Sequence, residues 1–250
     1  MIAARQIAFG KAAGKKEETP AYWGLCFTAE EAGSTVAMQA VGSAPAVTLE
    51  TSFDGEIWEP FAVGETTITL PNVGDKVYFR AGEGGNTAMC KGSSSYNNFV
   101  MAGRIAASGN IMSLLGSDAT ANKVVRFGFF GLFRECTSLT VAPELPVTNL
   151  FNANSCYSYM FYGCTSLTVA PELPATNASN AAGRYSAMFM ACKNLKWIKT
   201  AQSNFGVNSG WVTDVSPVGT FVCPTALGTN ETISRGDSAC PEGWTVINVD

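Results

Sequence analysis

Histidine is absent from the sequence, and charged side chains are scarce. None of the 250 residues is histidine, and only 14% are Asp, Glu, Lys or Arg. The chain therefore lacks Ser-His-Asp and Cys-His catalysis, imidazole ligands for zinc, and the usual general base at neutral pH. Carboxylate-only chemistry, as in glycoside hydrolysis, is disfavoured rather than excluded. We expect a protein that is not an enzyme and that uses no cofactor or metal.

A basic surface and long apolar runs are also missing. The net charge is -4 and the sequence pI is near 5.0, whereas a nucleic-acid binder needs a basic face that releases phosphate counterions. No apolar run reaches the length of about 18 residues that a membrane span needs. If Met1 is the natural start, residues 1–10 hold too short an apolar stretch for a signal peptide, which predicts no export by the general secretory route.

The eight cysteines include no Cys-x-x-Cys pair, which argues against a zinc ribbon or a thioredoxin-like site. Three of them, Cys136, Cys164 and Cys192, recur every 28 residues. Side chains that point the same way from stacked coils have poor geometry for a disulfide, so we expect these three to be buried thiols. A bridge between Cys223 and Cys240 stays open.

The strongest positive signal is an internal repeat, which decides the fold before any other feature. The octapeptide Leu-Thr-Val-Ala-Pro-Glu-Leu-Pro occupies residues 139–146 and returns unchanged at 167–174. One such unit cannot bury its apolar face alone, so neighbouring units are expected to stack into a solenoid. Two columns of buried side chains should result, one made of Leu139, Leu167 and Leu195 and the other of Phe133, Phe161 and Phe189.

Each unit is expected to hold a short helical turn, as in residues 156–164, followed by a short strand. The strand begins at the leucine of the octapeptide and ends at its prolines, which cannot donate to a ladder. Residues 197–199 replace the Val-Ala-Pro segment in the third unit, and this departure predicts a terminal cap. Residues 219–223 and 244–249 are expected to be strands that close the C-terminal end.

The segment before the repeats is expected to be β. Five short runs rich in Val, Thr, Phe and Ile are separated by turn residues, and Asp54-Gly55 is a hairpin signal. Five strands at this spacing suggest a small sandwich or an open barrel. The five expected strands are residues 25–28, 35–40, 47–52, 66–70 and 76–80.

The expected fold class is mainly β with short helices: a small sandwich-like domain followed by a short leucine-rich-repeat-like solenoid with 28-residue coils. Residues 83–130 are expected to form a connection and the N-terminal cap of the solenoid, with a β segment in residues 98–115 that leads into a short helix. The other expected parts are an extended docking tail in 1–20, the β domain in 21–82, the coils in 131–200 and a C-terminal cap in 201–250.

Residues 160–176 read Met-Phe-Tyr-Gly-Cys-Thr-Ser-Leu-Thr-Val-Ala-Pro-Glu-Leu-Pro-Ala-Thr. This phrase resembles BspA-type leucine-rich repeats, which are common in surface proteins of gut Bacteroidales and in proteins of their phages. The flanking segments resemble the same group, so the resemblance covers roughly residues 21–250. It implies adhesion or host recognition, and it brings no catalytic residues. Members often carry more coils than the three expected here.

The tail suggests where such a protein would sit. Arg5, Gln6, Ile7 and Phe9 form the expected docking peptide, which is followed by a Lys/Glu/Gly linker. A docking tail, a β domain and a recognition tip together suit a phage head or tail fibre or a decoration protein. Such a virion protein would attach to a capsid or tail protein through residues 1–20. The alternatives are a bacterial cell-surface adhesin and a carbohydrate-active enzyme.

By analogy with phage fibres we also expect a homotrimer, associated around Trp23, Phe53 and Trp58. A host surface glycan or protein is the expected ligand. The candidate ligand-facing residues are Tyr157, Tyr159, Tyr162 and Tyr185, because aromatic rings on the coils can stack on sugars. The alternative is that about half of these rings pack inside the stack. Repetition alone explains the matching positions of Glu144 and Glu172, so no catalytic carboxylate pair is expected.

Overall fold

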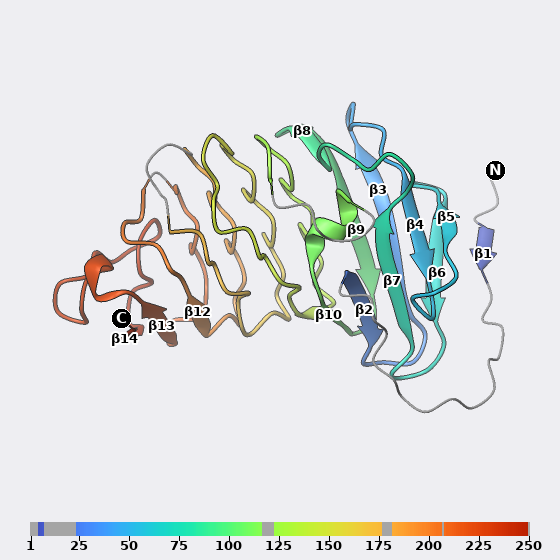
Figure 1. The fold of residues 1–250 in the computed structure, drawn as a ribbon. Helices are drawn as coiled ribbons and strands as arrows, with labels where there is room; N and C mark the ends of the chain where they lie inside the picture. The colour runs from blue at the N-terminus through green and yellow to red at the C-terminus, as the bar shows by residue number, and fades with distance from the viewer. Residues whose placement is uncertain (1–4, 8–23, 117–122, 177–181, 207, 250) are drawn as a thin grey trace.

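The computed structural model of the chain is mainly β with almost no helix (Figure 1). It describes residues 5–7, 24–116, 123–176, 182–206 and 208–249. Two sheets lie at the N-terminal end, and the chain then coils away from them toward the C-terminal end. Helix within the described ranges is limited to two short 3-10 segments, η1 (Ile111–Leu114) and η2 (Thr225–Leu227). No described helix is long and apolar enough to cross a membrane.

The two sheets have five and six strands. The first has the order β1-β6-β3-β9-β8, and the second β11-β10-β2-β7-β4-β5. The strands of the first sheet are β1 (Arg5–Ile7), β6 (Thr66–Leu70), β3 (Ser34–Val41), β9 (Ser95–Ala102) and β8 (Cys90–Gly92). Those of the second are β11 (Leu139–Val141), β10 (Ile105–Ser108), β2 (Leu25–Ala29), β7 (Lys76–Ala81), β4 (Leu49–Ser52) and β5 (Glu59–Phe61).

The sheets pack face to face through alternating side chains. Burial alternates along β3 and β6, as expected for strands with one face on a core. The rings of Phe27 and Phe99 come from opposite sheets, and their centroids lie 4.9 Å apart. Phe79 approaches Phe99 to 5.2 Å from the same side as Phe27. All five strands expected before the repeats are present, and Asp54-Gly55 lies in the hairpin between β4 and β5.

The sandwich extends further along the chain than the expected range of 21–82. Strands β8, β9 and β10 lie in the segment expected to be a connection, and all three belong to the two sheets. Four consecutive residues of β9, 96–99, are buried. Phe99 packs on Phe27 and Phe79 of the sandwich core, while Tyr96 packs on Phe130, which follows the sandwich in the chain. A strand buried on both faces has no alternating pattern for the sequence to reveal.

Beyond the sandwich, successive segments of chain stack on one another through backbone hydrogen bonds. The N–H of Phe133 donates to the carbonyl of Met160 over 2.9 Å, and that of Phe161 donates to Met188 over 3.0 Å. In both cases the acceptor lies 27 residues further along the chain. Segments that are equivalent in the 28-residue sequence repeat therefore lie next to each other in the structure. The same offset joins Phe129 to Cys156, Gly131 to Ser158, Tyr157 to Arg184 and Tyr159 to Ser186.

The expected helical turn in residues 156–164 is wrong, since this segment is a run of tight turns. Every fourth residue has a left-handed backbone: φ is 54° at Ser155, 57° at Tyr159 and 72° at Gly163. A helix needs consecutive right-handed residues, so these positions stop it from forming. Between them, N–H groups such as that of Met160 close four-residue β-turns within the coil. The remaining N–H groups are free to bond the next coil.

Both predicted columns of side chains are buried. Leu139, Leu167 and Leu195 are each 0% exposed. The rings of Phe133 and Phe161 stack 5.4 Å apart at 2°, and those of Phe161 and Phe189 stack 5.8 Å apart at 7°. Identical side chains at identical positions produce this alignment, because each coil presents the same surface to the next.

The stack continues past the third unit, so the terminal cap expected at residues 197–199 is wrong. These residues form β12 (Trp197–Lys199), which pairs in parallel with β13 (Thr220–Cys223), and β13 pairs with β14 (Thr245–Asn248). Both C-terminal strands were expected. Trp197 lies opposite Thr220, which lies opposite Thr245, so the coils shorten from 28 residues to 23 and 25. This change hides the repeat in the sequence.

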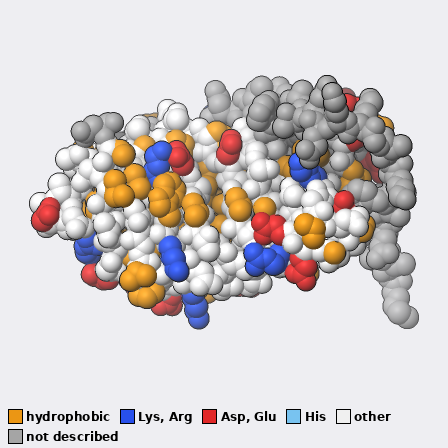
Figure 2. Space-filling view, turned by 90° about the horizontal axis from the view of Figure 1, so that it is seen from below, with side chains coloured by type: hydrophobic (Ala, Val, Ile, Leu, Met, Phe, Trp, Pro, Cys, Tyr) orange, Lys and Arg blue, Asp and Glu red, His pale blue; other side chains and the backbone are white. Residues whose placement is uncertain are grey.

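The strands of the coils share one side of the molecule. Val141 and Val169 hold equivalent positions and are 49% and 51% exposed, and Val169 bridges to the half-buried Trp197. Figure 2 shows hydrophobic side chains in a row along this underside, with charged groups around them. Single exposed apolar residues are normal on a protein surface.

Candidate functional site

Two of the four candidate tyrosines are inside the stack, so their assignment as ligand-facing residues is wrong. Tyr157 and Tyr185 are each 1% exposed, and their rings stack 6.0 Å apart at 9°. Phe129 continues the column, 6.1 Å from Tyr157. The coil places these three equivalent positions on its inner side, where an aromatic ring serves packing. Burial raises the pKa of the Tyr157 hydroxyl well above its ordinary value.

The other two tyrosines lie at the surface. Tyr159 and Tyr162 are half-buried, and their ring centroids are 5.7 Å apart. We call the half-buried rings of Phe127, Tyr159 and Tyr162 the aromatic strip. Two buried rings support it: Phe130 lies 5.9 Å from Phe127 and 5.3 Å from Tyr159, and Tyr96 lies 5.7 Å from Phe130. Sequence reasoning missed Phe127, because its equivalent in the next coil is Ser155.

The left-handed turns explain why the strip lies at the surface. Phe127 has φ 58° and Tyr159 has φ 57°, so both occupy the fourth-residue positions that interrupt the inward-facing run. Gly131 holds the position of Tyr159 in the preceding coil, with φ 64°. A Cβ atom there would lie 3.4 Å from the ring of Tyr96. This is an ordinary contact distance, so the positive φ is the feature that favours glycine at this position.

Two arginines lie over the strip. The Arg126 guanidinium is 4.9 Å from the centre of the Phe127 ring. That of Arg134 is 5.6 Å from the Tyr159 ring and 5.1 Å from the Tyr162 ring. Cation–π contacts of this kind contribute about 0.5–1 kcal/mol at exposed sites, which is enough to restrict where the cations sit.

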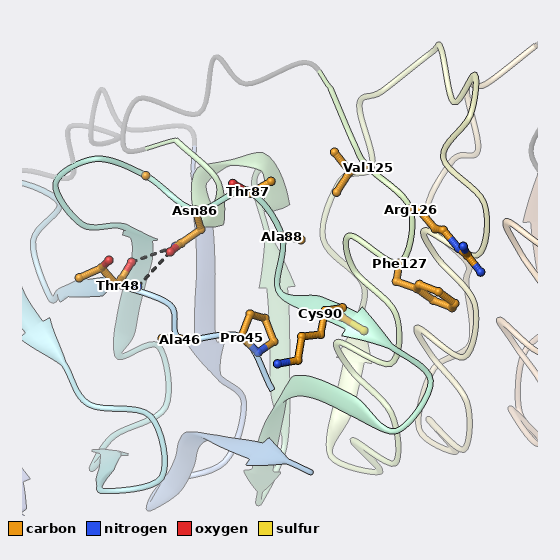
Figure 3. Close-up of a pocket in the computed structure, with 12 residues that line it drawn as sticks. Pro45, Ala46, Thr48, Asn86, Thr87, Ala88, Cys90, Val125, Arg126 and Phe127 are labelled. Carbon is orange, nitrogen blue, oxygen red and sulfur yellow. Dashed lines mark hydrogen bonds between the residues drawn. The ribbon is translucent and has the colours of Figure 1, made fainter. Parts of the chain in front are cut away.

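A pocket of about 790 Å³ adjoins the Phe127 end of the strip (Figure 3). Loops of the sandwich form one wall, and residues 125–127 of the first coil form the other. Asn86 fixes the sandwich wall: it accepts from the Thr48 N–H and donates to the carbonyls of Thr48 and Leu114, each over 2.9 Å. The charged side chains among the described lining residues are Lys91 and Arg126, and both are cationic.

A smaller pocket of about 300 Å³ lies near the other arginine. Arg134 and Glu135 line it together with Tyr96 and Asn98. The Arg134 Nε lies 3.4 Å from Glu135 Oε1, and 65% of the glutamate side chain is exposed. An exposed pair of this kind is worth little in stability. It does offer a charged and polar edge beside aromatic rings.

Acidic and cysteine side chains do not gather into a metal site in the described part of the chain. No group of three or more Asp, Glu or Cys side chains there could hold a metal ion. Glu144 and Glu172 line a proline-rich pocket, and Glu172 is bound to Lys199 over 2.7 Å. The two carboxylates hold equivalent positions of the 28-residue repeat.

All eight cysteines are buried and free, including Cys223 and Cys240, which form no bridge. The three repeat thiols each donate to a carbonyl of the preceding layer: Cys192 reaches Phe161 over 3.0 Å, and Cys164 and Cys136 make the same contact. Burial raises the pKa of Cys192 to about 12. A thiol protonated at neutral pH is a poor nucleophile, so these residues serve packing.

The expected docking peptide is described in part. Arg5, Gln6 and Ile7 form β1, which pairs in parallel with residues 66–68 of β6 and adds an edge strand to the five-stranded sheet. Phe9 lies outside the described residues, as does Trp23 of the expected trimer contact. Phe53 and Trp58 are half-buried, and Arg80 lies 4.1 Å over the Trp58 ring.

Comparisons with protein-family models, curated proteins and solved structures give no match.

Proposed function

We propose that the chain is a non-enzymatic virion protein of a phage, a head or tail fibre or a decoration protein, that recognises glycans on the host surface. The observation that supports recognition is the aromatic strip: three half-buried rings held in place by buried rings beneath and arginines above. Sugar rings present flat C–H faces that pack on such rings, and partly exposed aromatics of this kind mark interaction sites.

Within this proposal the stacked coils are a short leucine-rich-repeat-like solenoid of the BspA type. The repeated octapeptide and the buried leucine at each 28-residue step support this assignment. Its role is to hold residues of successive coils at a fixed spacing, because each coil is bonded to the next along its backbone. Tyr159 and Phe127 come from different coils and share one surface for this reason.

Glycan recognition by the strip predicts a specific loss on mutation. Replacing both Tyr159 and Tyr162 by Ala should weaken binding to the preferred members of a glycan array at least tenfold, since stacked rings contribute about 1.4 kcal/mol or more. Phe151→Ala is the matched control, because this ring is 56% exposed in the same coil and lies outside the strip. Equal binding by the double variant and the wild type would refute the strip as the recognition site.

The proposal places the protein in the virion, attached through residues 1–20 to a capsid or tail protein and assembled as a homotrimer. Deleting residues 1–20 should abolish incorporation into the particle. It should shift the melting temperature by only a few degrees, since β1 contributes three residues at a sheet edge. Mass spectrometry of purified virions measures incorporation. Detection in bacterial envelopes and not in virions would instead favour the alternative, a cell-surface adhesin.

A further inference from the structure

The charge around the aromatic strip is opposite to that of the chain as a whole. The chain has a net charge of -4, yet Arg126 and Arg134 lie over the strip and Lys91 lines the pocket at its end. Glu135 is the acidic residue among the described residues that line the two neighbouring pockets. A local excess of cations on an acidic protein attracts anionic ligands.

Arg126 and Lys91 are the cations available for such a ligand. Both are exposed, and no carboxylate of a described residue lies within ion-pair distance of either. Arg134, in contrast, is close to Glu135. Arginine suits this role, because its planar guanidinium binds a carboxylate through two parallel hydrogen bonds and also stacks on rings.

The pocket beside these cations is formed in advance. Asn97 donates to the carbonyls of Pro45 and Met89 over 3.0 and 3.1 Å, and so ties two sandwich loops together. Asn86 holds the loop at Thr48 in the same way. On the coil side, Figure 3 shows Arg126 and Phe127 extending together from one turn. The sandwich wall therefore needs little ordering when a ligand binds, which favours affinity.

We propose that the strip and the adjoining pocket bind an acidic saccharide that carries carboxylate groups. Sugar rings pack against the parts of Phe127, Tyr159 and Tyr162 that the two arginines leave exposed, and a carboxylate enters the pocket to meet Arg126 and Lys91. This inference rests on the proposed function, because it specifies the class of glycan that the strip recognises. The carboxylate is the feature that distinguishes this ligand from a neutral glycan of the same shape.

The test compares carboxylated saccharides with matched neutral ones. The probes are the uronic-acid oligosaccharides and sialylated glycans of an array, each beside its carboxyl-reduced form. The wild-type chain should bind the carboxylated members at least tenfold more tightly, and added salt should reduce this preference. The variant with Lys91→Gln and Arg126→Gln should lose the preference, so that it binds each carboxylated saccharide and its reduced form equally. Arg80→Gln is the matched control, because Arg80 also lies over an aromatic ring, that of Trp58.

The outcomes separate this inference from the proposed function. Equal binding of the acidic and reduced forms, lost in the Tyr159→Ala and Tyr162→Ala variant, would overturn the carboxylate site and leave glycan recognition standing. A preference that persists in the Lys91→Gln and Arg126→Gln variant would also overturn this site. Binding to no glycan would overturn the proposed function and this inference with it. Both substituted side chains are exposed, so an unchanged melting temperature shows that the variant is folded.

Discussion

The sandwich and the coil stack both consist of β structure, but they satisfy their backbone groups in different ways. In the sandwich, β3 and β9 pair antiparallel over seven residues, from Thr35 opposite Ala102 to Val41 opposite Tyr96. In the coils, β12 is three residues long and pairs in parallel, and many bonds between neighbouring coils come from turn residues. The sandwich thus depends on extended strands, whereas the stack depends on the same short pattern returning in every coil.

The two regions nevertheless share one core. The ring of Phe99 in β9 stacks on Phe133 of the first coil, 5.3 Å away at 14°. Phe133 also approaches Phe27 of the sandwich, and all three belong to one continuous cluster of buried residues. The sandwich therefore covers the first coil as a further layer would, and the two regions are expected to unfold together.

Removing one large buried side chain from the middle of the stack tests most directly whether the stack and the sandwich unfold together. Phe161→Ala removes a ring that packs between Phe133 and Phe189, and loss of a buried phenylalanine costs about 3–5 kcal/mol. We expect the urea midpoint to fall, with one transition in both near- and far-ultraviolet circular dichroism. Phe151→Ala, at an exposed ring, should change the free energy of unfolding by less than about 0.5 kcal/mol. Two separate transitions would show that sandwich and stack are independent.

At alkaline pH the buried thiols of the stack should lower the stability of the protein more than Cys26 of the sandwich does. Burial raises the pKa of Cys156 and Cys192 in the stack to about 12, from an ordinary 9.0. Below pH 9 these thiols are protonated in both states, so their contribution to stability is fully present. Between pH 9 and about 12 the unfolded chain releases protons that the folded chain keeps, and stability falls.

The measurement is the urea midpoint at pH 8, 9.5 and 10.5. Replacing Cys156 or Cys192 by Ala should make the midpoint less dependent on pH. Cys26 of the sandwich is the matched comparison: burial raises its pKa, while the charge of Lys76 acts against the shift. Cys26→Ala should therefore change the pH dependence less. A larger change from Cys26→Ala than from Cys192→Ala would contradict the difference that we draw between the regions.

The sequence reveals the sandwich strands and the repeat because both leave periodic signals. Alternation marks β3, and the 28-residue interval marks the two buried columns. The β segment and short helix expected in residues 98–115 are present as part of β9, β10 and η1. That β9 belongs to the sandwich is missed, because its burial does not alternate. The last coils are missed because the interval shortens before β13 and β14. Two of the four tyrosines that the sequence offers as ligand-facing residues lie at the surface, and the other two are buried. Residue type identifies the tyrosines, but the backbone decides that Tyr159 faces out and Tyr157 faces in.

The smallest expected effect concerns the backbone feature that most distinguishes the stack from the sandwich, its left-handed turns. Glu135, Gly163 and Ala191 hold equivalent positions in three coils, with φ of 62°, 72° and 63°. A side chain at such an angle costs about 1–2 kcal/mol, part of which is offset by the greater freedom of glycine in the unfolded chain. Glu135→Gly should therefore stabilise the protein by about 0.5–1 kcal/mol, although it removes the exposed pair with Arg134.

Thermal unfolding of three variants tests this reasoning against its alternative, that side chains at these positions stabilise by packing. Ala191→Gly should also raise the melting temperature, whereas Gly163→Ala should lower it by a similar amount. A Cβ at Gly163 would meet the Glu135 side chain at an ordinary contact of 3.4 Å, so the loss there measures backbone strain and not a collision. If Glu135→Gly lowers stability while Ala191→Gly raises it, the glutamate side chain itself supports the first coil, and the turns of the stack are not energetically equivalent.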